Sequence, residues 1–256
     1  MSKIYRLPVP AFMIVLAGLF LAPDALPQNA SQPASDWPEI KINPASKARI
    51  KFESDSWEFG SIPRGSTVVH AFKFRNVGQD TLEISAVKPT CGCTTAPLSS
   101  NEIPPGGEGT IKAYFNSKNF NGRVNKQIYV DSNDPINPYL KVSFSAIIND
   151  PTQTILLNPM EPDFGSIKAG SPTKAKVIIS NNGPGEAQME IVEISSPSAL
   201  KAAISQDRLA PMATAELAIE LTNEAAPGEF KESVTIEAAG EHKSRFTIPC
   251  KAIITQ

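Results

Sequence analysis

The sequence contains few of the side chains that bind transition metals and redox clusters. Its 256 residues include only 3 Cys and 2 His. A four-cysteine zinc site, an iron–sulfur cluster or a set of haems needs more such ligands, so these protein classes are excluded. Charged residues make up 20% of the chain and the formal net charge is −2, so we expect no basic surface for nucleic acid.

The sequence also lacks the patterns that accompany enzyme chemistry and helical folds. Ser, Asp and Glu are scattered without a Ser/His/Asp or paired-carboxylate context, and no glycine-rich phosphate loop is present. The 23 prolines exclude a mainly helical protein, because each removes a backbone donor and clashes with the preceding helical turn. We therefore predict that the chain is not an enzyme and that it is built from strands.

The N-terminal segment has the layout of a secretory signal peptide. Lys3 and Arg6 precede the uncharged apolar run Ala11–Ala22, and small residues follow up to two candidate cleavage positions, Ala25 and Ala30. A retained membrane anchor is the alternative, but twelve apolar residues are too few for a span of about 20. We predict cleavage, with no stable membrane span afterwards.

Export by the general route gives a periplasmic or extracellular protein, in a compartment that permits disulfides. Residues 1–30 are assigned to the signal peptide. Residues 31–48 are rich in Pro, Ser, Asn and Ala, a composition typical of a linker.

The rest of the chain consists of two tandem copies of one sequence unit. Phe59-Gly60-Ser61-Ile62 is repeated as Phe164-Gly165-Ser166-Ile167, an offset of 105 residues. Further matches occur in the same order with one residue of drift: Asn76 with Asn181, Ile103-Pro104-Pro105 with Leu209-Ala210-Pro211, Gly122 with Gly228, and Ala146-Ile147-Ile148 with Ala252-Ile253-Ile254. We therefore predict two domains, residues 49–149 and 150–256.

Apolar residues alternate with polar ones within each unit, which is typical of antiparallel sheets with one buried face. The clearest run is Leu140, Val142, Phe144, Ala146 and Ile148, and Leu82, Ile84 and Ala86 show the same spacing. Turn sequences separate about seven such runs in each unit. This spacing predicts two tandem immunoglobulin-like β-sandwiches, an all-β fold.

The first unit resembles the bacterial domain-of-unknown-function 1573 family over about residues 50–148. The resemblance rests on these motifs: Phe59-Gly60-x-Ile62-x-x-Gly65, Phe72-x-Phe74-x-Asn76-x-Gly78, Thr90-Cys91-Gly92-Cys93-Thr94 and Ile103-Pro104-Pro105-Gly106-Gly107. The layout is also similar to the wider group of hydin-like immunoglobulin domains. The resemblance implies a secreted or surface β-sandwich of poorly known role. The second unit lacks the Cys-Gly-Cys segment and is a divergent copy.

The Cys91-Gly92-Cys93 segment is the one feature with obvious chemistry. It follows a strand expected to end near Val87, which places it on an end loop of the sandwich. In extended backbone, residues i and i+2 point to the same side, so we expect the two thiols to converge. The residues expected to shape this loop are Thr90, Gly92, Thr94, Pro105 and Gly106.

Three roles are open for the pair. A disulfide in so small a ring is easily reduced, which suits thiol exchange. Two thiolates suit Cu(I), and the spacing resembles that of the copper chaperones of cytochrome oxidase assembly, although Gly92 and Thr94 replace the flanking aromatic residues of those proteins. The third role is structural, pinning a loop. Apart from Cu(I), no cofactor is expected.

The remaining Cys and His residues favour structural roles. Cys250 falls on the inward phase of the last strand, in register with Phe144 of the first unit, and is expected to be an inert core thiol. His70 alternates with core residues and His242 falls in a turn. The segment Ser132-Asn133-Asp134-Pro135 favours an Asx turn over a calcium site.

These observations favour an exported cell-envelope β-sandwich protein that acts as a structural or protein-interaction module, with unidentified envelope proteins as partners. The alternative is a thiol-redox or Cu(I)-binding, metallochaperone-like protein that uses the Cys91–Cys93 loop. The first hypothesis draws on the ability of sandwich edges to receive an extended peptide.

Overall fold

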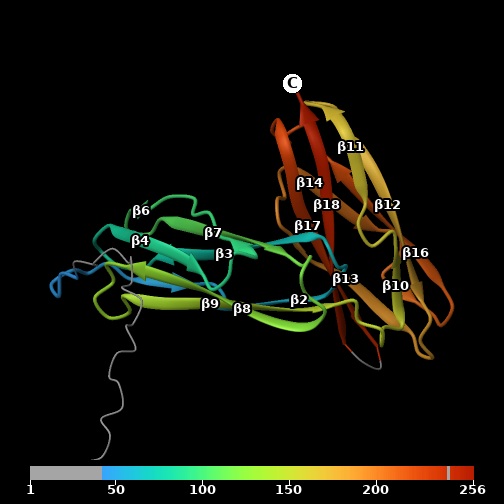
Figure 1. Ribbon diagram of the computed structural model, residues 1–256, viewed down its shortest axis with the longest axis horizontal. Coiled ribbons are helices and arrows are strands. Elements are labelled where there is room, and N and C mark those ends of the chain that lie inside the picture. The colour runs from blue at the N-terminus through green and yellow to red at the C-terminus, as the bar shows by residue number, and fades with distance from the viewer. Residues whose placement is uncertain (1–41, 241–242) are drawn as a thin grey trace, which may run out of the picture. The chain divides into compact units, whose positions relative to one another are not determined.

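The computed structural model describes residues 42–240 and 243–256, and these residues form strands, turns and loops without a helix. The predicted all-β fold of two tandem immunoglobulin-like domains is confirmed (Figure 1). The strands of the first sandwich are β1 (Ile50–Phe52), β2 (Ser56–Ile62), β3 (Thr67–Asn76), β4 (Leu82–Pro89), β5 (Thr94–Thr95), β6 (Glu102–Ile103), β7 (Glu108–Asn116), β8 (Gly122–Ser132) and β9 (Tyr139–Ile148).

Two sheets enclose the core of the first sandwich. One has the strand order β1-β3-β7-β5, and the other runs β2-β9-β8-β4-β6. Their inner faces meet in a cluster rich in aromatic rings, with Phe115 5.3 Å from Phe144 and Phe59 5.4 Å from Phe144 between ring centroids. The period-two pattern of β9 is confirmed, because Val142, Phe144, Ala146 and Ile148 are all buried.

The second sandwich repeats this plan in the yellow to red strands of Figure 1. One sheet has the order β10-β12-β16-β14 and the other contains β15-β13-β17-β18, with β11 paired to β18. The strands are β10 (Ile155–Asn158), β11 (Asp163–Lys168), β12 (Thr173–Asn181), β13 (Ala187–Ile194), β14 (Leu200–Ile204), β15 (Arg208–Leu209), β16 (Thr214–Leu221), β17 (Gly228–Ala239) and β18 (Ser244–Thr255).

The repeat seen in the sequence is also a repeat of hydrogen bonds. The buried amide of Asn76 donates to the carbonyls of Asp80 (2.8 Å) and Ile103 (2.9 Å), and its Oδ1 accepts from the N–H of Gly78 (2.9 Å). Asn181 makes the equivalent three bonds, to Gly185, Leu209 and Gly183, at 2.8, 2.9 and 2.9 Å. In each copy one side chain therefore ties a turn to a neighbouring strand end.

Three details of the first sandwich differ from the sequence-based expectations. The predicted alternation of buried residues Leu82, Ile84 and Ala86 is wrong at Ala86. A register shift between Ile84 and Ala86 turns Val87 toward the core instead. Strand β4 also continues past Val87, through Pro89.

The third correction concerns the expected linker, 31–48. Ala48, at its end, is fully buried, and the carbonyl of Lys47 accepts a hydrogen bond from Gln79 (2.9 Å). The sandwich therefore begins before residue 48.

The predicted signal peptide and residues 31–41 of the linker lie outside the described residues. Within the described ranges, no helix is long and apolar enough to cross a membrane.

Candidate functional site

Cys91 and Cys93 are joined by a disulfide bond, with their Cα atoms 5.2 Å apart. The expectation of extended backbone at this point is wrong. The segment is a turn, in which the N–H of Thr94 donates to the carbonyl of Cys91 (3.2 Å). The turn shortens the Cα separation below the roughly 6.6 Å that two extended residues span, and so brings the sulfurs into bonding range.

The ends of this loop are fixed and its tip is open. The N–H of Thr90 donates to the carbonyl of Gln127 (3.0 Å), and the N–H of Asn116 donates to the carbonyl of Cys93 (2.9 Å). Gly92 is exposed and the two cysteines are half-buried. A reagent from solution would therefore approach a disulfide that two neighbouring strands hold in place.

Thr94 places a polar side chain beside the sulfurs. It is buried, and its hydroxyl lies 3.7 Å from the Sγ atoms of both cysteines. A hydroxyl in this position could donate a weak hydrogen bond to a thiolate. Within residues 42–240 and 243–256, no group of three His, Cys, Asp or Glu side chains is arranged to hold a metal ion.

The structure does not bring Pro105 and Gly106 to this loop. They form a turn before β7, in which Gly107 donates to the carbonyl of Pro104 (2.9 Å), whereas Cys93 bonds to Asn116 at the far end of β7. Gly106 adopts a φ of 74°, the left-handed conformation that the turn before β7 requires.

Cys250 is a free thiol in the core of the second sandwich, with 1% of its surface exposed. Burial raises the pKa of this thiol, and the negative charges of Glu232 and Glu161 raise it further. The thiolate is therefore suppressed, and the expected inert core thiol agrees with these surroundings.

His70 has a structural role between the two sandwiches. Its ring stacks on Trp57 with centroids 4.0 Å apart, and its Nδ1 lies 2.7 Å from a carboxylate oxygen of Glu193. The neighbouring Val69 donates its N–H to the hydroxyl of Ser233 (2.9 Å). These contacts explain why Val69 is buried although it falls on the outward phase of β3.

His242 lies outside the described residues. Asp134 forms the predicted Asx turn, since its Oδ1 accepts from the N–H of Ile136 (2.9 Å). Its Oδ2 also accepts from the N–H of Ile50 (3.1 Å), so the side chain links a turn to β1.

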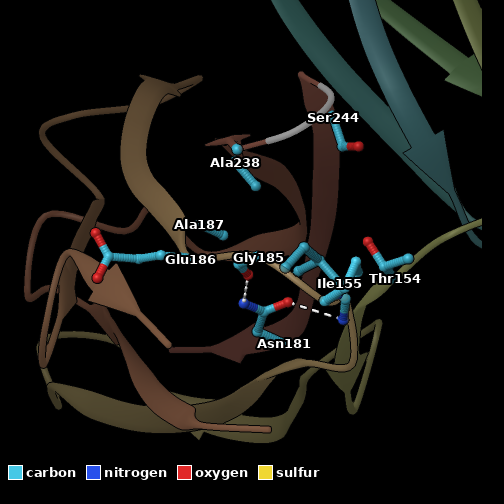
Figure 2. Close-up of a pocket in the computed structure, with 11 residues that line it drawn as sticks. Thr154, Ile155, Asn181, Gly185, Glu186, Ala187, Ala238 and Ser244 are labelled. Atoms are coloured by element: carbon cyan, nitrogen blue, oxygen red, sulfur yellow. Dashed lines mark hydrogen bonds between the residues drawn. The ribbon is translucent and has the colours of Figure 1, made fainter. Parts of the chain in front are cut away.

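Figure 2 shows a small pocket of about 60 Å³ in the second sandwich. Asn181 lies at its base, and the dashed lines mark the bonds of its side chain within the turn. Because the amide is already engaged on both its nitrogen and its oxygen, the pocket is a by-product of the turn and offers little to a ligand.

The feature that sequence reasoning missed is the edge strand β14. It pairs with β16 on one side only, over five residues, Leu200–Ile204. The same edge of the first sandwich holds only β5, two residues long, and an isolated bridge at Leu98. Pro97 interrupts that edge, because a proline has no N–H to donate to the neighbouring strand. Its counterpart in the second sandwich is Ala203, so this difference was visible in the sequence.

A groove of about 520 Å³ runs along β14. Its walls are mostly apolar and include Ile194, Pro197, Leu200, Ala202 and Ala218. The ion pair between Lys174 and Glu220 (3.3 Å) borders it. The second sandwich therefore combines an open strand edge with an adjacent apolar surface.

Comparison with known proteins finds two family matches, one in each sandwich. Residues 50–148 match the family described as protein of unknown function (DUF1573). Residues 153–252 match the HYDIN/CFA65/VesB-like, Ig-like domain. No curated protein matches the chain.

Two solved structures show a distant similarity to the chain. A protein of unknown function from Porphyromonas gingivalis W83 is 16% identical, with 80% of this chain and 99% of that chain covered and a TM-score of 0.37. The PapD-like domain 7 of human CEP192 is 11% identical, covering 42% of this chain and 91% of that one, with a TM-score of 0.32. The chain is therefore consistent with a two-unit protein whose first unit matches the DUF1573 family and whose second unit matches the HYDIN/CFA65/VesB-like, Ig-like domain.

Proposed function

We propose that the chain is an exported cell-envelope protein that acts as an interaction module, and that β14 of the second sandwich receives an extended segment of a partner protein. The observation that carries this proposal is the open edge of β14 beside an apolar groove. An added strand gains main-chain hydrogen bonds from such an edge, and a neighbouring groove selects alternate side chains of the segment.

The hydrogen-bond pattern indicates which amides of β14 are available. Ser205 donates to the carbonyl of Glu216 (2.8 Å), and Thr222 donates to the carbonyl of Ala199 (2.8 Å). Antiparallel bonding alternates along a strand, so the odd-numbered residues bond to β16. The N–H groups of Ala202 and Ile204 therefore point away from the sheet, toward an added strand.

The groove complements such a segment. Ala202 and Ala203 carry small side chains that leave room along the strand, and Ile194 and Pro197 supply an apolar wall. Natural proteins protect open edges by shortening them or by adding proline, as at Pro97 of the first copy. The continuous β14 has neither of these two features and carries a single charged side chain, Lys201, so its main chain is open to a partner strand.

Photo-crosslinking in the producing cells tests the proposal. A photoreactive amino acid replaces Lys201 in three backgrounds: the unaltered chain, Ala202→Pro and Ala202→Val. Proline removes the outward N–H and blocks the edge, whereas valine has a similar volume and keeps the N–H. We expect the same crosslinked partner in the first and third backgrounds and its loss with proline. A crosslink that survives Ala202→Pro contradicts the proposal, provided that both variants unfold at similar temperatures.

Export is tested separately. The apolar run Ala11–Ala22 and the small residues after it support cleavage by a signal peptidase. We expect the mature chain in the envelope or medium, with an N-terminus that begins after Ala25 or Ala30. An intact chain in the cytosol would contradict this part of the proposal.

A second candidate function is thiol–disulfide exchange at Cys91 and Cys93, favoured by the bonded, half-exposed pair on a fixed loop. An incoming thiolate of a dithiol protein would attack one sulfur, the bond between the cysteines would break, and the other cysteine would leave as a thiolate. The second thiol of that protein would then resolve the mixed disulfide, leaving Cys91 and Cys93 reduced and the partner oxidised. The closed ring spans only three residues, so its entropic stabilisation is about 1.6 kcal/mol, against about 4.7 kcal/mol for a ring of 100 residues. So small a stabilisation favours exchange over a purely structural role.

The equilibrium of the pair with a glutathione buffer tests this candidate. We expect a reduction potential above about −300 mV, whereas a lower value would make the bond structural. Titration of the reduced protein with Cu(I) against a competing chelator tests the copper alternative. One tightly bound equivalent that is lost in both Cys91→Ser and Cys93→Ser would favour metal handling, and no competitive binding would contradict it.

A further inference from the structure

The outer face of the first sandwich contains a groove of about 450 Å³ that the proposed function does not use. It lies over β2, β9 and β8, with Thr90 at its border. The side chains that give it its chemistry are Ser56, Thr90, Asn125, Gln127, Ser143 and Ser145.

The register of the three strands explains the hollow. Ser143 of β9 is paired with Ser56 of β2 on one side and with Gln127 of β8 on the other. Ser145 occupies the next outward position of β9, opposite Asn125. Two short serine side chains thus form the floor, with the longer Gln127 and Asn125 beside them on β8, and the surface is concave there.

Eight of the nine lining residues are uncharged, and six of these offer hydrogen bonds of both kinds. Each hydroxyl can donate and accept, and each amide side chain carries an acceptor oxygen and two donor hydrogens. Lys126 is the one charged residue that lines the groove, and its ammonium lies 4.3 Å from the ring of Phe120. An anionic ligand would find only this one lysine in the lining, and an apolar ligand would leave the polar groups without partners.

Exposed aromatic rings continue along the same outer face beyond Gln127. The hydroxyl of Tyr129 donates to Oε1 of Gln127 (3.1 Å), and this tyrosine is 38% exposed. Tyr139 is 62% exposed. It lies diagonally across from Tyr129, since Tyr129 pairs with Lys141, and such diagonal neighbours lie within reach of aromatic side chains.

We propose that this groove binds a neutral saccharide. A sugar presents a ring of hydroxyls, each both donor and acceptor, which matches the serine, threonine and amide side chains. It also presents apolar C–H faces, which pack on aromatic rings such as Tyr129. The site lies on the first sandwich and is independent of β14, so either proposal can fail without the other.

Nuclear magnetic resonance titration of the mature chain tests the assignment, with chitotriose, cellotriose and maltotriose as neutral probes and trigalacturonate as the acidic probe. We expect at least one neutral probe, at millimolar concentration, to shift the amides of Gln127 and Ser143. Ser143→Leu fills the floor and should abolish the shifts. Gln127→Ala should weaken binding about tenfold. Gln188→Ala, at an exposed position of β13, is the matched control and should leave binding unchanged.

Three results would each overturn the assignment. One is the absence of any shift at the groove with all three neutral probes. The second is binding that Ser143→Leu and Gln127→Ala leave intact while both variants remain folded. The third is binding of the acidic probe alone.

Discussion

The two sandwiches are copies of one scaffold that differ in what fills the core and in how one edge is finished. The first copy packs its core with aromatic rings, whereas the second has Val177, Ile179, Leu221 and Cys250 at the corresponding positions. The first copy closes the edge beside β7 with a disulfide-bonded turn and Pro97, and the second leaves β14 open. The hydrogen bonds of Asn76 and Asn181 are the same in both. The scaffold is therefore maintained by a few polar anchors, while the core and the edge have diverged.

The largest expected effect on stability comes from substitutions in the core. Phe144→Ala should lower the free energy of unfolding by about 3–5 kcal/mol, because it removes a buried ring that contacts Phe59 and Phe115. Cys250→Ala, at the matching position of the second copy, should cost about 1 kcal/mol, because only a sulfur is lost. Urea unfolding measures both values. Equal losses would mean that the two cores are more alike than their side chains indicate.

A smaller difference in stability cost is expected when alanine replaces the glycine that lies two residues after each anchor asparagine, Asn76 or Asn181. A Cβ added to Gly78 would lie 2.0 Å from the carbonyl oxygen of Lys47, whereas one added to Gly183 would lie 3.1 Å from Oδ1 of Asn181. Gly78→Ala should therefore cost about 2 kcal/mol and Gly183→Ala less than about 1 kcal/mol. If denaturant unfolding gives the same cost for both, the N-terminal segment at Lys47 is not held against the first sandwich.

Such packing differences explain which parts of the structure were predictable. The period-two pattern predicted the buried set of β9, and repeated Phe-Gly-Ser-Ile and Asn-x-Gly motifs predicted two copies. The pattern failed at Ala86, where a bulge changes the register, and at Val69, which contacts Ser233 of the other sandwich. Neither a bulge nor a long-range contact leaves a periodic signal in the sequence.

The candidate site was predictable in part. The close spacing of Cys91 and Cys93 identified the pair, but not the turn that joins them. Nor did it show that Pro105 and Gly106 lie at the other end of β7.

A third, smaller difference in stability is expected for substitutions in the turn before β7 and in the matching turn before β16. Gly106 has a φ of 74° and Met212 a φ of 64°, a left-handed conformation that costs a residue with a side chain about 1–2 kcal/mol. The relief in Met212→Gly exceeds the roughly 0.5–1 kcal/mol of chain entropy that glycine loses on folding, so stability should rise by about 0.5–1 kcal/mol. Gly106→Ala should have the opposite sign. A loss of stability in Met212→Gly would show that this exposed side chain makes a contribution of its own.

The smallest expected effect is on the pH dependence of stability. Asp131 of β8 and Glu237 of β17 occupy matching positions, and their contributions should change with pH in opposite directions. Burial raises the pKa of Asp131, and Lys88 opposes this only in part. Burial also acts to raise the pKa of Glu237, but hydrogen bonds from Lys243 and Arg245 and their charges outweigh it and lower the pKa.

The signs of the two effects follow from proton linkage. Asp131 binds its proton more tightly in the folded state, so its ionisation destabilises the fold as pH rises above 3.8. Asp131→Asn should therefore gain stability relative to the unaltered chain as pH rises from 3 to 7. Glu237 stabilises the fold above pH 4.5 and loses this effect as pH falls through its lowered pKa, so Glu237→Gln should be relatively weaker at pH 7 than at pH 3. Thermal unfolding at both pH values measures the slopes, and slopes of the same sign would contradict this assignment.

Amide hydrogen exchange along β14 tests the central claim, that the second copy carries an open edge, most directly. In the free protein, we predict slow exchange at Lys201 and Ala203, whose N–H groups bond to β16, and fast exchange at Ala202 and Ile204, whose N–H groups point outward. Equal protection of all four amides would show that this edge is already covered, and would contradict the account.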